Sequence, residues 1–161
     1  MKFSHSVDIN DPQNPSITPL TRQQLWLGLV LRAEAPKLFM PHLDRCTVFD
    51  PIENTVLREL HFGDLIIRDC VTFYVLQHVH YAIAEQGDIA ASSLIMRIEE
   101  APSGALSVLF EYDNGHDEAP DAANAMYDDY RRSAYFAADT DTIEIIRELA
   151  AQGALDRLAN Q

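Results

Sequence analysis

Asp69 is the side chain whose surroundings could best support chemistry. It stands in phase with Ile67, Val71 and Phe73 in a strand-like run, so it should share an apolar face with them. A carboxylate on such a face must be paired, hydrated or protonated. It could orient a polar group of a ligand or act as a general base. The alternatives are a pair with Arg58 on the neighbouring strand, or a bulge that turns Asp69 outward.

Metal and thiol chemistry have weaker support in the sequence. His78 and His80 share one strand face, but no Cys or carboxylate pattern completes the ligand set of a closed metal site. Neither Cys46 nor Cys70 has a neighbouring base or helix N-terminus that would activate a thiol. Phosphate-loop, nucleophile-elbow and zinc-protease motifs do not occur. We therefore expect no metal and no cofactor, and we assign no catalytic residue.

The elements that must position these side chains are mostly strands. Residues 2–10 alternate as a strand, and further apolar runs are separated by turn residues. The runs predict six more strands, at 43–50, 54–62, 65–75, 78–85, 92–100 and 105–113. Because the connections are short, consecutive strands should be antiparallel neighbours in one meander.

Helices are expected on either side of this meander. Thr21 and Gln24 fit a capping box that starts an apolar helix, and Pro36 should end it before one more helical turn. A second helical zone spans about 118–159, with a break expected near residue 140, where polar residues interrupt the apolar stripe. Gly153 is a plausible second weak point.

Together these elements predict a single α+β domain over residues 1–161. A curved seven-stranded antiparallel sheet would wrap around the long C-terminal helix, with two short helices after the first strand closing one end. An incompletely packed space between helix and sheet would form an apolar cavity. The alternative is a packed core that the tyrosines fill. The expected lining of the cavity is Trp26, Phe73, Tyr81, Met96, Phe110, Tyr112 and Tyr130, with Asp69 as its charged group.

Two further features bear on this cavity. Trp26 either packs in the core or lines the cavity. Arg32 and Glu34 stand at the end of the first helix. An arginine there is favoured by the helix dipole alone, and the alternative places both residues at the mouth of the cavity.

Composition restricts the partners. The 161 residues include 12 Lys and Arg against 25 Asp and Glu, a formal net charge of −13. Such a surface repels phosphate backbones, so we expect no nucleic-acid binding. No apolar run reaches the ~20 residues of a membrane span, and two cysteines make no disulfide scaffold. The expectation is a soluble cytoplasmic protein with a hydrophobic small molecule as its partner. Strand 54–62 could form the edge of a homodimer.

Several segments resemble one family. They are Phe3-Ser4-His5-Ser6-Val7, residues 20–26, residues 31–36, residues 58–64, Val71-Thr72-Phe73, Ser133-Ala134-Tyr135 and residues 145–149. Together they resemble the acetylaranotin-cluster protein L-like family, a domain of unknown function in the START/Bet v 1-like (SRPBCC) superfamily. The resemblance implies the helix-grip fold with a hydrophobic cavity between sheet and C-terminal helix. The superfamily includes lipid carriers, hormone receptors and polyketide cyclases, but no catalytic motif can be transferred.

Three functional hypotheses follow. The first is a small-molecule binding protein whose cavity takes a hydrophobic or aromatic metabolite. The second is an enzyme of the cyclase or aromatase kind, in which tyrosine hydroxyls or Asp69 would move protons. The third is a protein-interaction module with a packed core and an acidic surface.

Overall fold

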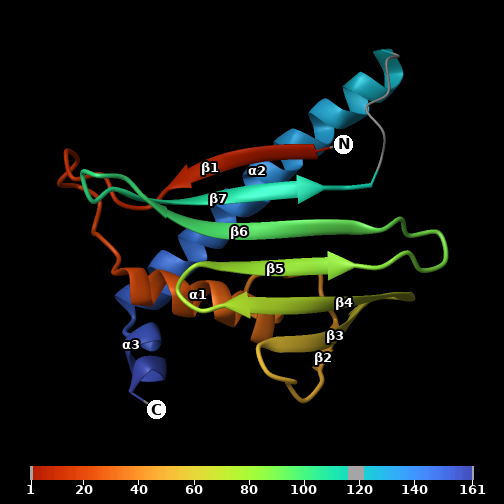
Figure 1. The fold of residues 1–161 in the computed structure, drawn as a ribbon, viewed down its shortest axis with the longest axis horizontal. Helices are drawn as coiled ribbons and strands as arrows, with labels where there is room; N and C mark the ends of the chain where they lie inside the picture. Colours follow the sequence, from red (N-terminus) through yellow and green to blue (C-terminus); the bar gives the residue numbers. More distant parts are fainter. Residues whose placement is uncertain (1, 116–121, 161) are drawn as a thin grey trace.

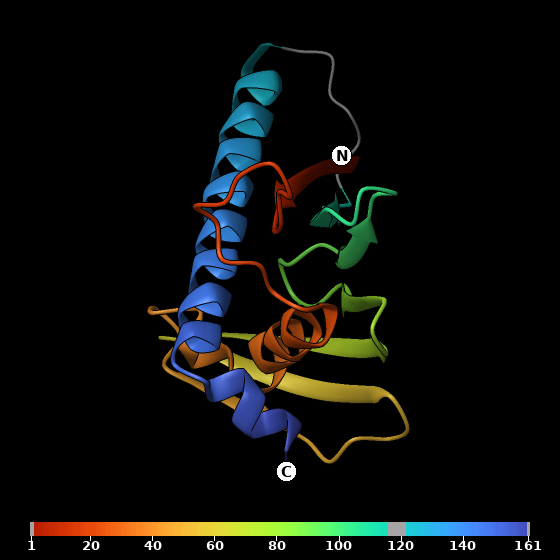
Figure 2. The same ribbon diagram turned by 90° about the vertical axis from the view of Figure 1, so that its left-hand side faces the viewer.

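A seven-stranded antiparallel sheet carries all the helices on one of its faces (Figures 1 and 2). The computed structural model describes residues 2–115 and 122–160. Its strands are Lys2–Asp8 (β1), Arg45–Val48 (β2), Thr55–Phe62 (β3), Leu65–Tyr74 (β4), His78–Ile83 (β5), Ser92–Glu100 (β6) and Leu106–Asp113 (β7). Its helices are Arg22–Glu34 (α1), the 3-10 turn Pro36–Leu38 (η1), Ala122–Ala151 (α2) and Ala154–Ala159 (α3).

The sheet is the predicted six-strand meander, and β1 joins it by pairing with the last strand, β7. The strand order is β1-β7-β6-β5-β4-β3-β2. The expectation that residues 54–62 form an edge is wrong, because β2 folds back onto β3 and leaves β1 and β2 at the edges. The β3–β4 ladder has no bulge and pairs Arg58 with Asp69 across the strands. Asp69 therefore keeps the phase of its apolar neighbours and faces the helices.

One α-helix, not two short helices, follows β1. The capping box forms as predicted: Thr21 Oγ1 accepts from the Gln24 backbone N–H at 3.0 Å, and the Thr21 N–H donates to Gln24 Oε1 at 2.9 Å. α1 ends before Pro36, and the stretch from there to Pro41 forms only the turn η1. Two prolines so close together leave room for a single turn.

The long helix α2 runs without interruption from Ala122 to Ala151, so the break expected near residue 140 is wrong. Two residues of the polar stretch, Asp139 and Thr142, face inward: Asp139 is 1% exposed, and the Thr142 hydroxyl donates to the Ala138 carbonyl oxygen within the helix. The chain turns instead at Gly153, whose φ of +75° suits glycine. Residues 118–121 of the expected helix lie outside the described residues. Within those residues, no helix is both long and apolar enough to cross a membrane.

The core lies between α1, the end of α2 and the concave face of the sheet. Leu25 and Leu29 of α1 are fully buried. At Gly28 the helices approach so closely that an added Cβ would lie 2.6 Å from Ile146 Cγ2. This packing fixes α1 against α2. It thereby positions the last turn of α1, which contains Arg32, over the sheet.

Candidate functional site

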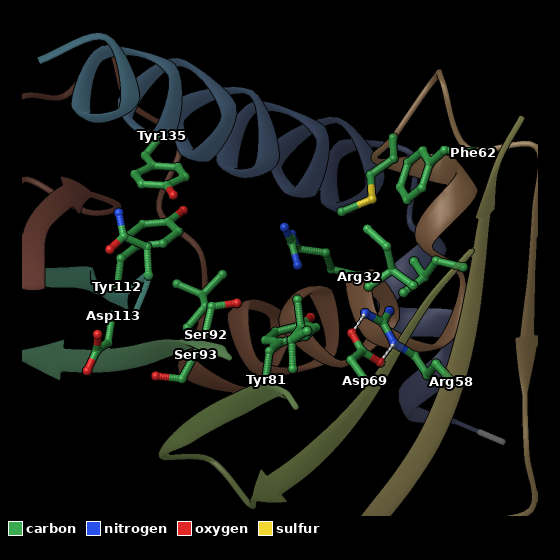
Figure 3. Close-up of a pocket in the computed structure, with 16 residues that line it drawn as sticks. Arg32, Arg58, Phe62, Asp69, Tyr81, Ser92, Ser93, Tyr112, Asp113 and Tyr135 are labelled. Atoms are coloured by element: carbon green, nitrogen blue, oxygen red, sulfur yellow. Dashed lines mark hydrogen bonds and ion pairs between the residues drawn. The ribbon is translucent and has the colours of Figure 1, made fainter. Parts of the chain in front are cut away.

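A pocket of about 260 Å³ opens between strands β3 to β7, the end of α1 and the middle of α2 (Figure 3). Most of its wall is apolar, and the polar groups are few. The apolar lining includes Met40, Leu60, Phe62, Ile67, Ile83 and Leu94, and the polar lining includes Arg32, Arg58, Asp69, Tyr81, Tyr112 and Tyr135. An apolar hollow with a small number of placed polar groups is the usual form of a small-molecule site.

Arg58 and Asp69 form a buried ion pair on the floor of this pocket (Figure 3). Arg58 Nε donates to Asp69 Oδ1 at 2.9 Å and Nη2 donates to Oδ2 at 2.5 Å. Arg58 Nη1 donates to the Ala33 carbonyl oxygen at 2.9 Å, which ties β3 to α1. Burial alone would lower the pKa of Arg58, but the hydrogen bond and charge of Asp69 hold it above its ordinary value. Of the alternatives for Asp69, the structure shows the pair with Arg58.

Tyr81 lies between two guanidinium groups. The Cζ atoms of Arg32 and Arg58 are each 5.2 Å from the centre of its ring. Arg32 is only 9% exposed, and its Nε has no hydrogen-bond partner among the described residues. The buried Tyr81 hydroxyl also has none. Two residues of the pocket that contact each other thus each carry a hydrogen-bond donor with no partner in the described part of the chain, and such groups are rare in folded proteins.

At the other end of the pocket, Tyr112 belongs to a buried network. Its hydroxyl donates to the Asp139 carboxylate, with 2.7 Å to each oxygen, and His5 Nε2 lies 2.6 Å from Asp139 Oδ2. Burial raises the pKa of Asp139, although hydrogen bonds from Tyr112 and His5 oppose this. Burial, followed by the charge of Asp139, raises the pKa of Tyr112, which is a neutral phenol. Tyr135 of α2 stacks on the Tyr112 ring with centres 4.0 Å apart.

The structure brings together three of the eight residues expected at the cavity: Asp69, Tyr81 and Tyr112 line the pocket. Four others pack in the core outside it, namely Trp26, Phe73, Met96 and Phe110. Tyr130 differs most from the expectation, because it is 72% exposed. The first turns of α2 project past the sheet beyond β1 (Figure 1), where no strand lies beneath them.

Sequence reasoning missed part of this site. It considered Arg32 as one alternative for the cavity mouth, whereas His5 and Asp139 received no role. The signal for Asp139 was the polar interruption of the helical stripe, which suggested a break rather than an inward carboxylate. Its partner His5 is 134 positions away, so no local pattern connects them. Among the described residues, no group of three or more His, Cys, Asp or Glu side chains is arranged to hold a metal ion.

The sequence profile of one protein family matches residues 7–153, nearly the whole chain. The family is described as acetylaranotin biosynthesis cluster protein L. A search of curated protein sequences gives no match.

Solved structures share the fold at low identity. The di-domain aromatase/cyclase StfQ of the steffimycin biosynthetic pathway aligns over 95% of this chain, with 10% identity and a TM-score of 0.68. This chain spans only 52% of that protein. The Zhui aromatase/cyclase from Streptomyces sp. R1128 aligns over 93% of this chain and 95% of its own, with 14% identity and a TM-score of 0.60. Ara h 8.0201 aligns over 92% and 98%, with 11% identity and a TM-score of 0.57.

Proposed function

The chain belongs to the acetylaranotin biosynthesis cluster protein L family, and on that premise we propose that it binds a small hydrophobic or aromatic molecule. The molecule occupies the pocket between the sheet, α1 and α2. The observation that most supports this is the pocket itself, about 260 Å³ with mostly apolar walls. A cavity of roughly 150 Å³ holds one benzene ring, so this pocket suits a molecule of one or two rings.

The expected affinity follows from the buried surface. A ligand that buries roughly 300 Å² of apolar surface gains about 7 kcal/mol, at about 25 cal/mol per Å². One or two hydrogen bonds to the polar groups of the wall bring the total close to the roughly 8 kcal/mol of micromolar binding. Micromolar affinity is therefore within reach of a ligand of this size.

The direct test is native mass spectrometry on protein purified from its own host, before and after organic extraction. The expected result is a reproducible extra mass that extraction removes. Protein that shows only the chain mass, and then binds none of a panel of aromatic and fatty compounds, would instead favour the protein-interaction module.

Filling the pocket should abolish this binding. Leu94 lines the pocket from β6, with Tyr81 and Tyr112 as its partners on the neighbouring strands. Replacing Leu94 by tryptophan places a larger ring where the ligand would lie, and we expect at least a tenfold loss of affinity, about 1.4 kcal/mol. Calorimetric titration with the extracted compound measures it. The matched control is Ile52→Trp, at a position that is 74% exposed, and equal affinities in the two variants would contradict the proposal.

An enzyme of the aromatase/cyclase kind is the second candidate, because two of the solved structures above carry that name. The observation that favours it is the hydrogen-bonded series Tyr112, Asp139 and His5 at the pocket wall. A proton removed from the ligand can pass to the Tyr112 oxygen while Tyr112 gives its own proton to Asp139. Burial raises the pKa of this carboxyl, so it accepts a proton more readily than an exposed one.

Replacing Tyr112 by phenylalanine separates the two candidates. The variant keeps the ring that stacks on Tyr135 and removes only the hydroxyl. If turnover occurs, we expect it to fall about 100-fold or more, the usual size of a general acid–base contribution, while affinity changes little. Cyclised product from a linear poly-β-keto thioester, followed by mass spectrometry, is the readout, and Tyr135→Phe is the control. Wild-type protein without turnover, or an undiminished rate in Tyr112→Phe, would remove the enzyme candidate.

A further inference from the structure

Arg32 is a buried cation that forms no ion pair with any described residue, although its charge and that of Asp139 act on each other. Its side chain is 9% exposed and points from the last turn of α1 into the open part of the pocket (Figure 3). Within residues 2–115 and 122–160 it takes part in no ion pair or hydrogen bond, and its Nε is among the buried atoms without a partner. A guanidinium carries its charge at all physiological pH values, so this charge lies in the pocket in the ligand-free protein.

The carboxylates around Arg32 are already engaged elsewhere. Asp69 receives two hydrogen bonds from Arg58. Asp139 accepts from Tyr112 and is in contact with His5. Asp113, which also lines the pocket, accepts from the Gly115 backbone N–H. The formal charges of the pocket wall therefore balance, with Arg32 and Arg58 against Asp69 and Asp113, but among these four side chains only Arg32 makes no ion pair or hydrogen bond to a described residue.

Two features of the protein compensate this charge only partly. The face of the Tyr81 ring lies 5.2 Å from Arg32 Cζ, in the geometry of a cation–π contact. The C-terminal end of α1 contributes the partial negative charge of its dipole. Neither supplies hydrogen-bond acceptors for the guanidinium N–H groups, and a buried charge is costly unless it is both paired and hydrogen-bonded.

The Tyr81 hydroxyl is the second unsatisfied group of the same region. It is buried, lines the pocket and has no hydrogen-bond partner within residues 2–115 and 122–160. A guanidinium and a phenol hydroxyl both need a hydrogen-bond acceptor, and the guanidinium favours one that carries negative charge. A carboxylate meets both needs, because its two oxygens can accept from both groups.

We propose that the ligand of this pocket is a small carboxylic acid with an apolar or aromatic body. Its carboxylate pairs with Arg32 and accepts from Tyr81, and its body lies against Leu60, Ile83 and Leu94. The inference rests on the proposed binding function and adds the charge and chemical class of the ligand. The single guanidinium without an ion pair, that of Arg32, matches a monoanion, whereas a phosphate dianion would leave one of its charges unpaired.

The net charge of the protein makes a preference for an anionic ligand informative. The chain carries a formal charge of −13, so its long-range field repels anions. A preference of the wild-type protein for an anion over a neutral molecule of equal shape must therefore come from a local cation inside the pocket.

The experiment compares two probes of the same ring system, 2-naphthoate and the neutral naphthalen-2-ylmethanol, by calorimetric titration of the full chain. Wild-type protein should prefer the carboxylate by about tenfold or more, the usual strength of a charge-assisted hydrogen bond. Arg32→Met should weaken carboxylate binding by about 10- to 100-fold and weaken alcohol binding much less, because the variant removes the charge that only the carboxylate uses. Arg32→Lys should restore part of the preference, since it keeps the charge without the guanidinium fork.

The matched control is Arg45→Met, which makes the same charge change at an exposed position outside the pocket. It should leave both affinities unchanged. Tyr81→Phe is a second, independent variant for the case that Arg32→Met does not fold. It should lower the preference for the carboxylate over the alcohol.

The possible failures are distinguishable. Wild-type protein that binds both probes equally overturns the carboxylate inference and leaves the binding function standing. The carboxylate inference would also be overturned if Arg32→Met lowered the affinity for both probes equally. It would likewise be overturned if Arg45→Met lowered the carboxylate affinity as much as Arg32→Met. If wild-type protein binds neither probe and carries no extractable ligand, both the proposed binding function and the carboxylate inference are wrong.

Discussion

Replacing Asp69 by leucine should lower the free energy of unfolding by about 3–5 kcal/mol, the range for removing one partner of a buried ion pair. The side chains of Arg58 and Asp69 are only 2% and 4% exposed. Without the carboxylate, the Arg58 guanidinium keeps a single hydrogen bond, to the Ala33 carbonyl oxygen, and remains out of reach of water. The loss is therefore mainly the cost of an unpaired buried charge.

Urea denaturation followed by circular dichroism measures this loss. The control is Glu111→Leu, which removes the carboxylate from a cross-strand pair with Arg97 whose side chains are each 38% exposed. That change should cost no more than about 1 kcal/mol, because exposed pairs contribute little. The double variant Arg58→Met with Asp69→Leu should regain much of the loss, since it removes both charges. Similar losses in Asp69→Leu and Glu111→Leu would contradict this account.

A second large effect is expected at Asp139. Asp139→Leu leaves the Tyr112 hydroxyl and the His5 ring without their acceptor, at a cost of about 2–4 kcal/mol for two buried polar groups. The control is Asp141→Leu, at an exposed position on the same helix. If the two leucine variants have the same stability, the network does not stabilise the fold.

Asp139 should also make stability depend on pH. Burial raises the pKa of this carboxyl above its ordinary value of 3.8. The folded chain then holds a proton that the unfolded chain has already released, so stability falls as the pH rises through this window. Asp139→Asn does not titrate. The stability advantage of the wild type over Asp139→Asn should therefore be greatest below pH ~4 and shrink as the pH rises towards neutrality, while Asp141→Asn follows the wild type throughout.

The sequence was sufficient for the sheet because the evidence there is local. Alternating apolar residues and short turns define each strand, and Asp69 occupies the same face as Val71, one of the alternatives that its phase allowed. The capping box at Thr21 is equally local. The edge strand was predicted wrongly because edges depend on where β2 folds back, and its four residues carry little pattern.

The site was predicted less well because its contacts join distant parts of the chain. Tyr130 belongs to the expected helical stripe, but the stripe does not tell where the helix leaves the sheet. Asp139 looked like a helix break because its acceptor role depends on Tyr112 and His5, on two other elements. For Arg32 the opposite holds: its type and position were noted, but only the three-dimensional structure reveals that it has no ion-pair or hydrogen-bond partner among the described residues.

The pairing of β1 with β7 also determines when the site can form. Residues 2–8 align with residues 107–113, so the first strand must wait for the last before its hydrogen bonds can be made. On a ribosome, the meander from β2 to β6 can assemble while β1 is still unpaired, and α2 emerges later still. Contacts of such long sequence separation slow folding. His5 belongs to β1 and Asp139 to α2, so the hydrogen-bond network beside the pocket forms only at the end of folding. The Arg58–Asp69 pair can form earlier.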